Sequence, residues 1–163
     1  MISKKQLQGA RDVLDRAKQR GLKIVTAESC TGGLIAASLT AVPGASLVIE
    51  RGFITYSNEA KSELLGVPPE LISRRGAVSE EVALAMVDGA LKHSLADIAV
   101  AVTGIAGPDG GSPEKPVGLV HIAAARRGGA RLHEEKRFGD IGRTNVQAET
   151  VVAALALVQR LVD

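Results

Sequence analysis

Ser29 is the first residue whose type and position could support chemistry. It lies in the segment 26–33, TAESCTGG, where a predicted strand turns into a predicted helix. The start of a helix offers unpaired N–H groups and the positive end of the helix dipole, and glycines let a ligand approach the backbone. Such a turn could expose a nucleophilic hydroxyl and also supply oxyanion donors. Because Ser and Thr favour N-cap positions, capping by Ser29 or Thr31 is the simpler explanation of the spacing alone.

A serine hydroxyl is a weak nucleophile, so a base is needed beside it. The chain has three histidines. His93 ends a predicted helix, where it would interact with carbonyl groups, while His121 lies inside a buried strand and His133 on a polar one. None has a carboxylate partner in the local sequence, so a Ser-His-Asp triad has little support. This result directs attention to lysine.

Lys61 is the candidate base. It lies on a short predicted helix at 58–65, with Leu64 and Leu65 three and four positions later, so its Cβ points along the apolar stripe. Burial would lower the pKa of the amine by desolvation and leave a neutral general base. The more common arrangement is that the stem covers the leucines and the amine reaches water. Only a pairing with an exposed Ser29 favours the base.

A glycine-rich segment at 103–118, TGIAGPDGGSPEKPVG, follows a predicted buried strand. Ligands of α/β sheets bind at the carboxyl ends of strands, and successive N–H groups can form a nest for an anion such as phosphate. The segment is neither a Walker loop nor a dinucleotide fingerprint. A plain surface loop is the alternative, although connections of this length are often functional.

Three further residues have weaker signals. Tyr56 is the only tyrosine and could stack on an aromatic ring or hydrogen-bond near Lys61. Arg143 precedes the last predicted helix and could hold a phosphate in a bidentate contact. Both could equally be structural. Cys30 is expected to be a small buried hydrophobe.

The elements that must position these residues alternate between strands and helices, which indicates a layered α/β sandwich. The polar segment 131–138 suggests a strand near an edge and a sheet that is mixed rather than wholly parallel. Ser79 is a plausible N-cap for a helix that begins with two glutamates. The predicted helices are 4–20, 31–41, 58–65, 80–94 and 143–162, and the predicted strands lie at 22–27, 47–56 (one or two strands), 97–103, 117–125 and 131–138.

Composition excludes several classes of protein. The 163 residues fit one domain, 1–163, and 45% hydrophobic with 23% charged residues is typical of globular proteins. No apolar run reaches the roughly 20 residues that cross a bilayer, and the N-terminus lacks the apolar region of a signal peptide. We therefore expect a soluble, cytoplasmic protein with no membrane contact. A single cysteine, Cys30, excludes an intramolecular disulfide and a zinc cage of thiolates.

Partners are constrained in the same way. A net charge of +2 and only three aromatic residues argue against a nucleic-acid partner. Apolar helix faces with few aromatics are compatible with a homodimer but do not demonstrate one.

Four motifs together resemble the CinA C-terminal domain family, whose stand-alone members include nicotinamide-nucleotide amidases (PncC-like). These motifs are TAESCTGG at 26–33, GFITYSNEAK at 52–61, GAVSE at 76–80 and the glycine-rich segment 103–118. They occur in the family's order, and the resemblance runs from the first predicted helix to the last. It implies a three-layer α/β/α sandwich with a mixed, mostly parallel sheet. It also implies hydrolysis of nicotinamide mononucleotide to nicotinate mononucleotide and ammonia, without metal or cofactor.

The resemblance also implies roles for individual residues. Ser29 would be the nucleophile, Lys61 its base, and Tyr56 would assist at the site. Family members often have GlyAspArg before the last helix, whereas this chain has GlyAspIleGlyArg, so Arg143 is offset from its expected phosphate-binding position. The substrate pocket would be lined by small and hydroxyl-bearing residues: Thr31, Gly32, Gly33, Thr103, Gly104 and, in the following loop, Gly107.

Two other functions stay open at this point. The chain could be a nucleotide-sensing or partner-binding domain that has kept the pocket and lost catalysis. It could also be an amidase for another small carboxamide.

Overall fold

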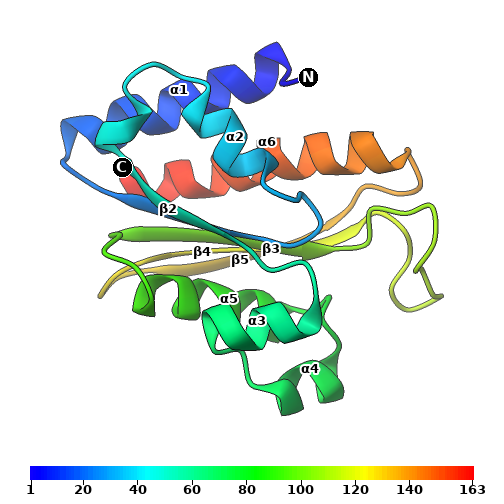
Figure 1. Ribbon diagram of the computed structural model, residues 1–163. Helices are drawn as coiled ribbons and strands as arrows, with labels where there is room; N and C mark the ends of the chain where they lie inside the picture. Colours follow the sequence, from blue (N-terminus) through cyan, green and yellow to red (C-terminus); the bar gives the residue numbers. More distant parts are fainter.

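Five strands form one sheet at the centre of the molecule, and the computed structural model describes residues 1–163 (Figure 1). The strands are β1 (Ile24–Glu28), β2 (Ile49–Ile54), β3 (Ile98–Gly104), β4 (Leu119–Arg126) and β5 (Arg131–Arg137). Their order in the sheet is β2-β1-β3-β4-β5. β1 pairs in parallel with both β2 and β3, whereas β4 is antiparallel to β3 and to β5. Four strands therefore share one direction, which confirms a mixed, mostly parallel sheet with the polar strand at its edge.

Helices cover both faces of this sheet and complete a three-layer sandwich (Figure 1). One face carries α1 (Lys4–Gln19), α2 (Leu34–Thr40) and α6 (Arg143–Val162). The other carries α3 (Asn58–Leu65), α4 (Pro69–Arg75) and α5 (Glu80–Lys92). A short 3₁₀ helix, η1 (Ala45–Leu47), leads into β2. A membrane-spanning helix needs about 20 apolar residues, and none of these helices has that combination of length and apolarity.

Alternation along β3 divides the apolar residues between two cores. Ile98, Val100 and Val102 belong to the core beneath α1, α2 and α6, while Ala99 and Ala101 belong to the core beneath α5. Successive side chains of a strand point to opposite faces, so a strand covered on both sides is apolar throughout. The alanines explain why α5 packs closely on its face.

Two differences from the predicted elements have local causes. The second helix begins at Leu34 instead of 31, because Gly32 and Gly33 both have positive φ values, 58° and 105°, that a helix cannot contain. The pattern did not predict α4, which opens on Pro68 and Pro69. Proline breaks helix interiors but is well suited to the first helical position.

The direction of the strands gathers three connections at one edge of the sheet. The turn at 29–33 follows β1, residues 55–57 follow β2, and the loop from 105 follows β3. Because these three strands are parallel, their carboxyl ends meet at the same edge. The crossover from β1 covers one face and the crossover from β2 covers the other, which is the arrangement that leaves a ligand crevice in open α/β sheets.

Candidate active site

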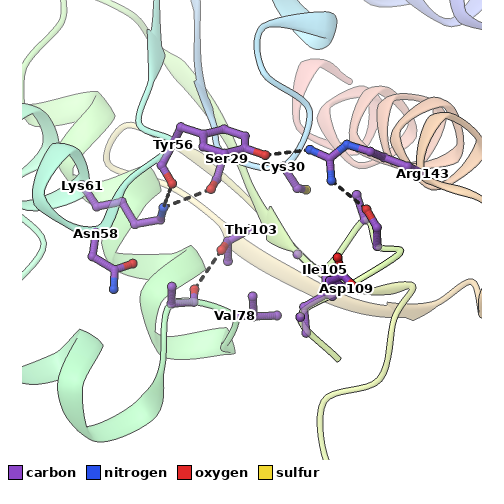
Figure 2. A pocket seen from close by; sticks show the side chains of 15 residues that line it. Ser29, Cys30, Tyr56, Asn58, Lys61, Val78, Thr103, Ile105, Asp109 and Arg143 are labelled. Carbon is purple, nitrogen blue, oxygen red and sulfur yellow. Dashed lines mark hydrogen bonds between the residues drawn. The ribbon is translucent and has the colours of Figure 1, made fainter. Parts of the chain in front are cut away.

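A cavity of about 260 Å³ opens at this edge (Figure 2). Its walls come from the ends of β1, β2 and β3, from the segment before α5, and from the first residue of α6. The side chains that Figure 2 labels are Ser29, Cys30, Tyr56, Asn58, Lys61, Val78, Thr103, Ile105, Asp109 and Arg143. Segments far apart in the chain thus meet around one space.

Lys61 and Ser29 lie side by side in this cavity. The Nζ atom of Lys61 is 3.0 Å from the Oγ atom of Ser29, which is hydrogen-bond distance. Lys61 is only 1% exposed, so the arrangement in which its amine reaches water is wrong. Side chains on a helix point back toward its N-terminus, and Lys61 lies in the first turn of α3. The amine is therefore carried to the strand end that precedes the helix.

The remaining neighbours of the amine are all carbonyl oxygens. Nζ lies 2.8 Å from the oxygen of Thr55, 3.3 Å from that of Tyr56 and 3.5 Å from that of Ser57. No carboxylate accepts a hydrogen bond from it, and burial lowers the pKa of Lys61 below its ordinary value of 10.5. A neutral amine has two N–H groups and one lone pair. The carbonyls can only accept, so the Ser29 hydroxyl is the neighbour that can donate to the lone pair.

A buried carboxylate, not a hydroxyl, holds the start of α2. Glu28 is fully buried, and its side chain accepts hydrogen bonds from the main-chain N–H of Ile35 and Ala36 and from the Oγ1 hydroxyl of Thr31. The N-cap position is Gly33, which makes no side-chain hydrogen bond. Capping by Ser29 or Thr31 is therefore wrong. The negative Glu28 also occupies the positive end of the helix dipole, where an external anion would otherwise bind.

The turn between Glu28 and α2 retains free donors. The main-chain N–H of Ser29 donates to Val102, and that of Gly32 donates to Ser29. Between them, the N–H groups of Cys30 and Thr31 donate to no acceptor within the protein. In a strand-to-helix turn that carries a nucleophile, the N–H of the next residue is a common oxyanion donor. The geometry makes such a role available to Cys30.

The thiol of Cys30, unlike its N–H, is not suited to chemistry. It borders the cavity but is 5% exposed and belongs to the apolar core. Burial raises the pKa of this thiol to about 12. A thiol with so high a pKa is protonated at neutral pH and is a poor nucleophile. Cys30 is thus the buried hydrophobe that its position predicted.

Arg143 and Tyr56 close the outer side of the cavity (Figure 2). The NH2 atom of Arg143 donates to the Tyr56 hydroxyl at 2.7 Å, and its NH1 atom donates to the carbonyl of Gly107 at 2.8 Å. One guanidinium therefore joins the connection after β2, the loop after β3 and the start of α6. The two extra residues before Arg143 do not remove it from the cavity.

The loop after β3 also faces the cavity. Thr103 is buried, and its hydroxyl donates to the carbonyl of Ala77, which fixes the neighbouring wall at 77–78. Beyond it, Gly104 lines the cavity. Four residues of the following loop line the cavity and have N–H groups without an acceptor in the protein: Ala106, Gly107, Asp109 and Gly110. Such a run of free N–H groups has the composition of an anion nest.

Some of the predicted residues lie outside the cavity lining. Thr31 directs its hydroxyl to Glu28, and Gly32 and Gly33 shape the turn through their positive φ values. Direct contact of these three residues with a ligand stays a prediction. The sequence interpretation did not single out Glu28, Asn58 or Asp109. Glu28 could have been noticed as the one acidic residue at the end of an otherwise uncharged strand.

The histidines lie elsewhere. His93 places its Nδ1 atom 2.8 Å from the carbonyl of Gly89, as predicted for the end of that helix. His121 and His133 form a stacked pair, with Nδ1 of His121 2.9 Å from Nε2 of His133. Neither lines the cavity that holds Ser29. No histidine therefore lies beside Ser29.

Comparisons with known proteins agree with the resemblance of the motifs. The CinA C-terminal domain model matches residues 6–162. A CinA-like protein from Citrifermentans bemidjiense is 50% identical over 143 residues, covering 88% of this chain and 34% of that protein. A CinA-like protein from Akkermansia muciniphila is 63% identical over 111 residues, covering 68% of this chain and 27% of that protein. The chain thus spans about a third of the length of the curated relatives it matches.

Solved structures match over nearly the full chain. The competence/damage inducible protein CihA from Agrobacterium tumefaciens has a TM-score of 0.98 and 51% identity, covering 100% of this chain and 99% of that chain. A CinA superfamily protein from Escherichia coli has a TM-score of 0.89 and 32% identity, covering 99% of this chain and 93% of that chain. Family match, sequence identity and fold agree: this chain belongs to the CinA C-terminal domain family.

Proposed function

We propose that the chain is an amidohydrolase that converts nicotinamide mononucleotide to nicotinate mononucleotide and ammonia. The observation that carries the proposal is the 3.0 Å approach of the buried Lys61 amine to the Ser29 hydroxyl at the wall of the cavity. A desolvated lysine beside a serine is one of the known ways to activate a hydroxyl nucleophile. The resemblance to nicotinamide-nucleotide amidases supplies the substrate.

Acylation begins with proton transfer. Neutral Lys61 takes the proton of the Ser29 hydroxyl as Oγ attacks the carboxamide carbon. The carbonyl oxygen of the substrate becomes an oxyanion, which accepts a hydrogen bond from the free N–H of Cys30. Each such donor contributes about 10²–10³ in turnover in comparable sites. Positioned proton transfer by a base contributes roughly 10²–10⁴.

Collapse of the tetrahedral intermediate breaks the C–N bond. The Lys61 ammonium returns its proton to the leaving nitrogen, so ammonia departs and an ester of Ser29 remains. Water then attacks this ester and gives its proton to the neutral amine. The second collapse releases nicotinate mononucleotide and returns the proton to Ser29. Lys61 ends each half-reaction uncharged.

Recognition of the phosphate falls to the opposite side of the cavity. The Arg143 guanidinium and the free N–H groups of the loop at 106–110 supply a positive charge and several donors. Tyr56 accepts a hydrogen bond from Arg143 and orients it. This division supports a substrate with a reactive amide at one end and an anion at the other.

Ammonia release from nicotinamide mononucleotide, measured with a chelator present, tests the reaction. We expect Ser29→Ala and Lys61→Met each to lower turnover by at least about 10³, and the double variant to be little worse because the two groups act as a unit. Lys23→Met is the matched control. Its Nζ also donates to a main-chain carbonyl, that of Leu47 at 2.8 Å, at the other end of β1. Retained turnover in both site variants would reject the assignment.

Three outcomes separate the alternative functions. Tight binding of the mononucleotide without ammonia release would favour a sensing domain. Equal turnover of nicotinamide, its riboside and its mononucleotide would show that the phosphate is not recognised. We expect a preference for the mononucleotide that Arg143→Ala abolishes.

A further inference from the structure

Gln147 links α6 to the turn that carries Ser29. It lies one helical turn after Arg143, and its side-chain Nε2 atom donates to the carbonyl oxygen of Cys30 at 3.0 Å. The two residues are 117 positions apart in the chain. Arg143 bonds to other segments, so Gln147 makes the side-chain hydrogen bond that joins α6 to this turn.

The orientation of one carbonyl fixes the orientation of the N–H that follows. The peptide between Cys30 and Thr31 is trans, so its C=O and N–H groups point in opposite directions. When Gln147 holds the Cys30 carbonyl toward α6, the N–H of Thr31 is directed away from α6. The preceding peptide is fixed in the same way, because the carbonyl of Ser29 accepts from Gly32. The N–H of Cys30 therefore points away from Gly32.

The turn needs this restraint because its other end is permissive. Gly32 and Gly33 both have positive φ values, and glycine adopts many backbone conformations at little cost. Glu28 holds the Thr31 hydroxyl and the first N–H groups of α2, but it does not contact the peptide between Cys30 and Thr31. Of the side chains around the turn, Gln147 is the one that bonds to that peptide.

We propose that Gln147 is a positioning residue for the oxyanion. It holds the Cys30–Thr31 peptide and with it the backbone conformation of Cys30, so that the free N–H of Cys30 stays aligned with the negative charge that develops above Ser29. This role rests on the amidase reaction proposed above. Misplacement of a catalytic group by about 1 Å can cost a factor of 10² in rate, so loss of the restraint should act on kcat.

The test compares Gln147→Leu and Gln147→Glu with wild type in ammonia release from nicotinamide mononucleotide. Leucine removes the donor, and glutamate keeps the shape but presents an acceptor to the Cys30 carbonyl. We expect kcat to fall roughly 10- to 100-fold in both, with KM changed less than about twofold. Asn145→Ala is the matched control. Asn145 lies on the same helix, and its amide donates at 2.9 Å to the carbonyl of Ile141 in the segment before the helix, away from the turn, so kcat should be unchanged.

A sulfur substitution in the substrate separates positioning from a structural defect. In thionicotinamide mononucleotide, the atom that gains negative charge is sulfur, a weak hydrogen-bond acceptor. If Gln147 aligns the donor, the penalty of Gln147→Leu should shrink to about threefold or less with this substrate. Equal penalties with both substrates, or a change in KM alone, would overturn the proposal. Absence of turnover in the wild type would instead reject the amidase function, and with it the role that depends on it.

Discussion

The pH dependence of turnover tests whether Lys61 acts as a neutral base. The amine is 1% exposed, and burial lowers its pKa below 10.5. The ammonium form, which cannot take the Ser29 proton, dominates below the lowered pKa, and the neutral form dominates above it. We therefore expect kcat to rise with pH, by a factor of ten per pH unit, and to level off once the lowered pKa has been passed.

The size of the effect follows from the ionisation itself. Each pH unit below the pKa adds about 1.4 kcal/mol to the barrier, so about 1% of the plateau rate remains two units below it. The Cys30 thiol beside Ser29 does not cause the rise of kcat with pH, because its pKa is raised to about 12. The phosphate of the substrate titrates near pH 6, and saturating substrate reduces its influence on kcat.

The assay is ammonia release from saturating nicotinamide mononucleotide between about pH 5.5 and 10.5 at constant ionic strength. Cys30→Ala should leave the inflection where it is in the wild type, which identifies the titrating group as the amine. A kcat that is constant over this range, or a limb that inflects at 10.5 or above, would refute the reasoning. Either result would mean that Lys61 does not titrate as a buried base.

The same ionisation couples to folding. The unfolded chain holds the Lys61 proton up to the ordinary pKa of 10.5, whereas the folded chain releases it at lower pH. The unfolded state therefore binds more protons between the two values, and stability rises with pH across that window. Lys61→Met should remove this slope. Urea midpoints of the two proteins, measured across the window, give the difference.

Three further predictions concern the surroundings of the site. Tyr56→Phe and Arg143→Lys both break the 2.7 Å bond between these residues, so each should raise KM about fivefold in steady-state assays, with a double variant no worse than the larger single. Gly89→Ala should destabilise by at least about 1–3 kcal/mol in urea titrations, because its Cβ would overlap a main-chain oxygen of α3, whereas Gly9→Ala should stabilise α1 by about 0.5–1 kcal/mol. Burial, aided by the neighbouring imidazole of His133, lowers the pKa of His121 below 6.5. As the pH is lowered from 6.5, the urea midpoint of the wild type should therefore decrease, and that of His121→Gln should decrease less.

The layers of the fold could be predicted because apolar periodicity is a local property. The run at 97–103 is apolar throughout because both faces of β3 are covered, and Ser79 caps α5 as its type and spacing predict. The exceptions are equally local. The prolines at 68 and 69 disguise the helix α4 in the sequence pattern, and two glycines with positive φ place the start of α2 three residues later than predicted. The strand order β2-β1-β3 depends on pairings between distant segments and was not predicted.

The residues that carry the proposed chemistry were recognisable as a pair, a hydroxyl in a turn and an amine that could serve as its base, within motifs that resemble one family. A lysine on an apolar helix face and a serine in a strand-to-helix turn are each ambiguous alone. Periodicity gave the direction of the Lys61 side chain, but its distance from Ser29 depends on parallel pairing between β1 and β2. That pairing brings the two strand ends together. The sequence could therefore predict both groups, whereas only the fold gives their 3.0 Å separation.

The groups that hold the site in place were harder to predict from the sequence, and one of them, Glu28, decides which N–H groups of the turn stay free. Glu28 neutralises the start of α2, and the Gln147 contact spans 117 positions with no local pattern to mark it. With its helix end occupied by Glu28, the turn at Ser29 keeps the N–H groups of residues 30, 31 and 33 without an acceptor in the protein. In the amidase reaction proposed above, the loop after β3 and Arg143 would bind the phosphate. The proposed reaction therefore assigns its oxyanion and its phosphate to separate elements, so changes at Gln147 should alter kcat while changes at Arg143 should alter KM.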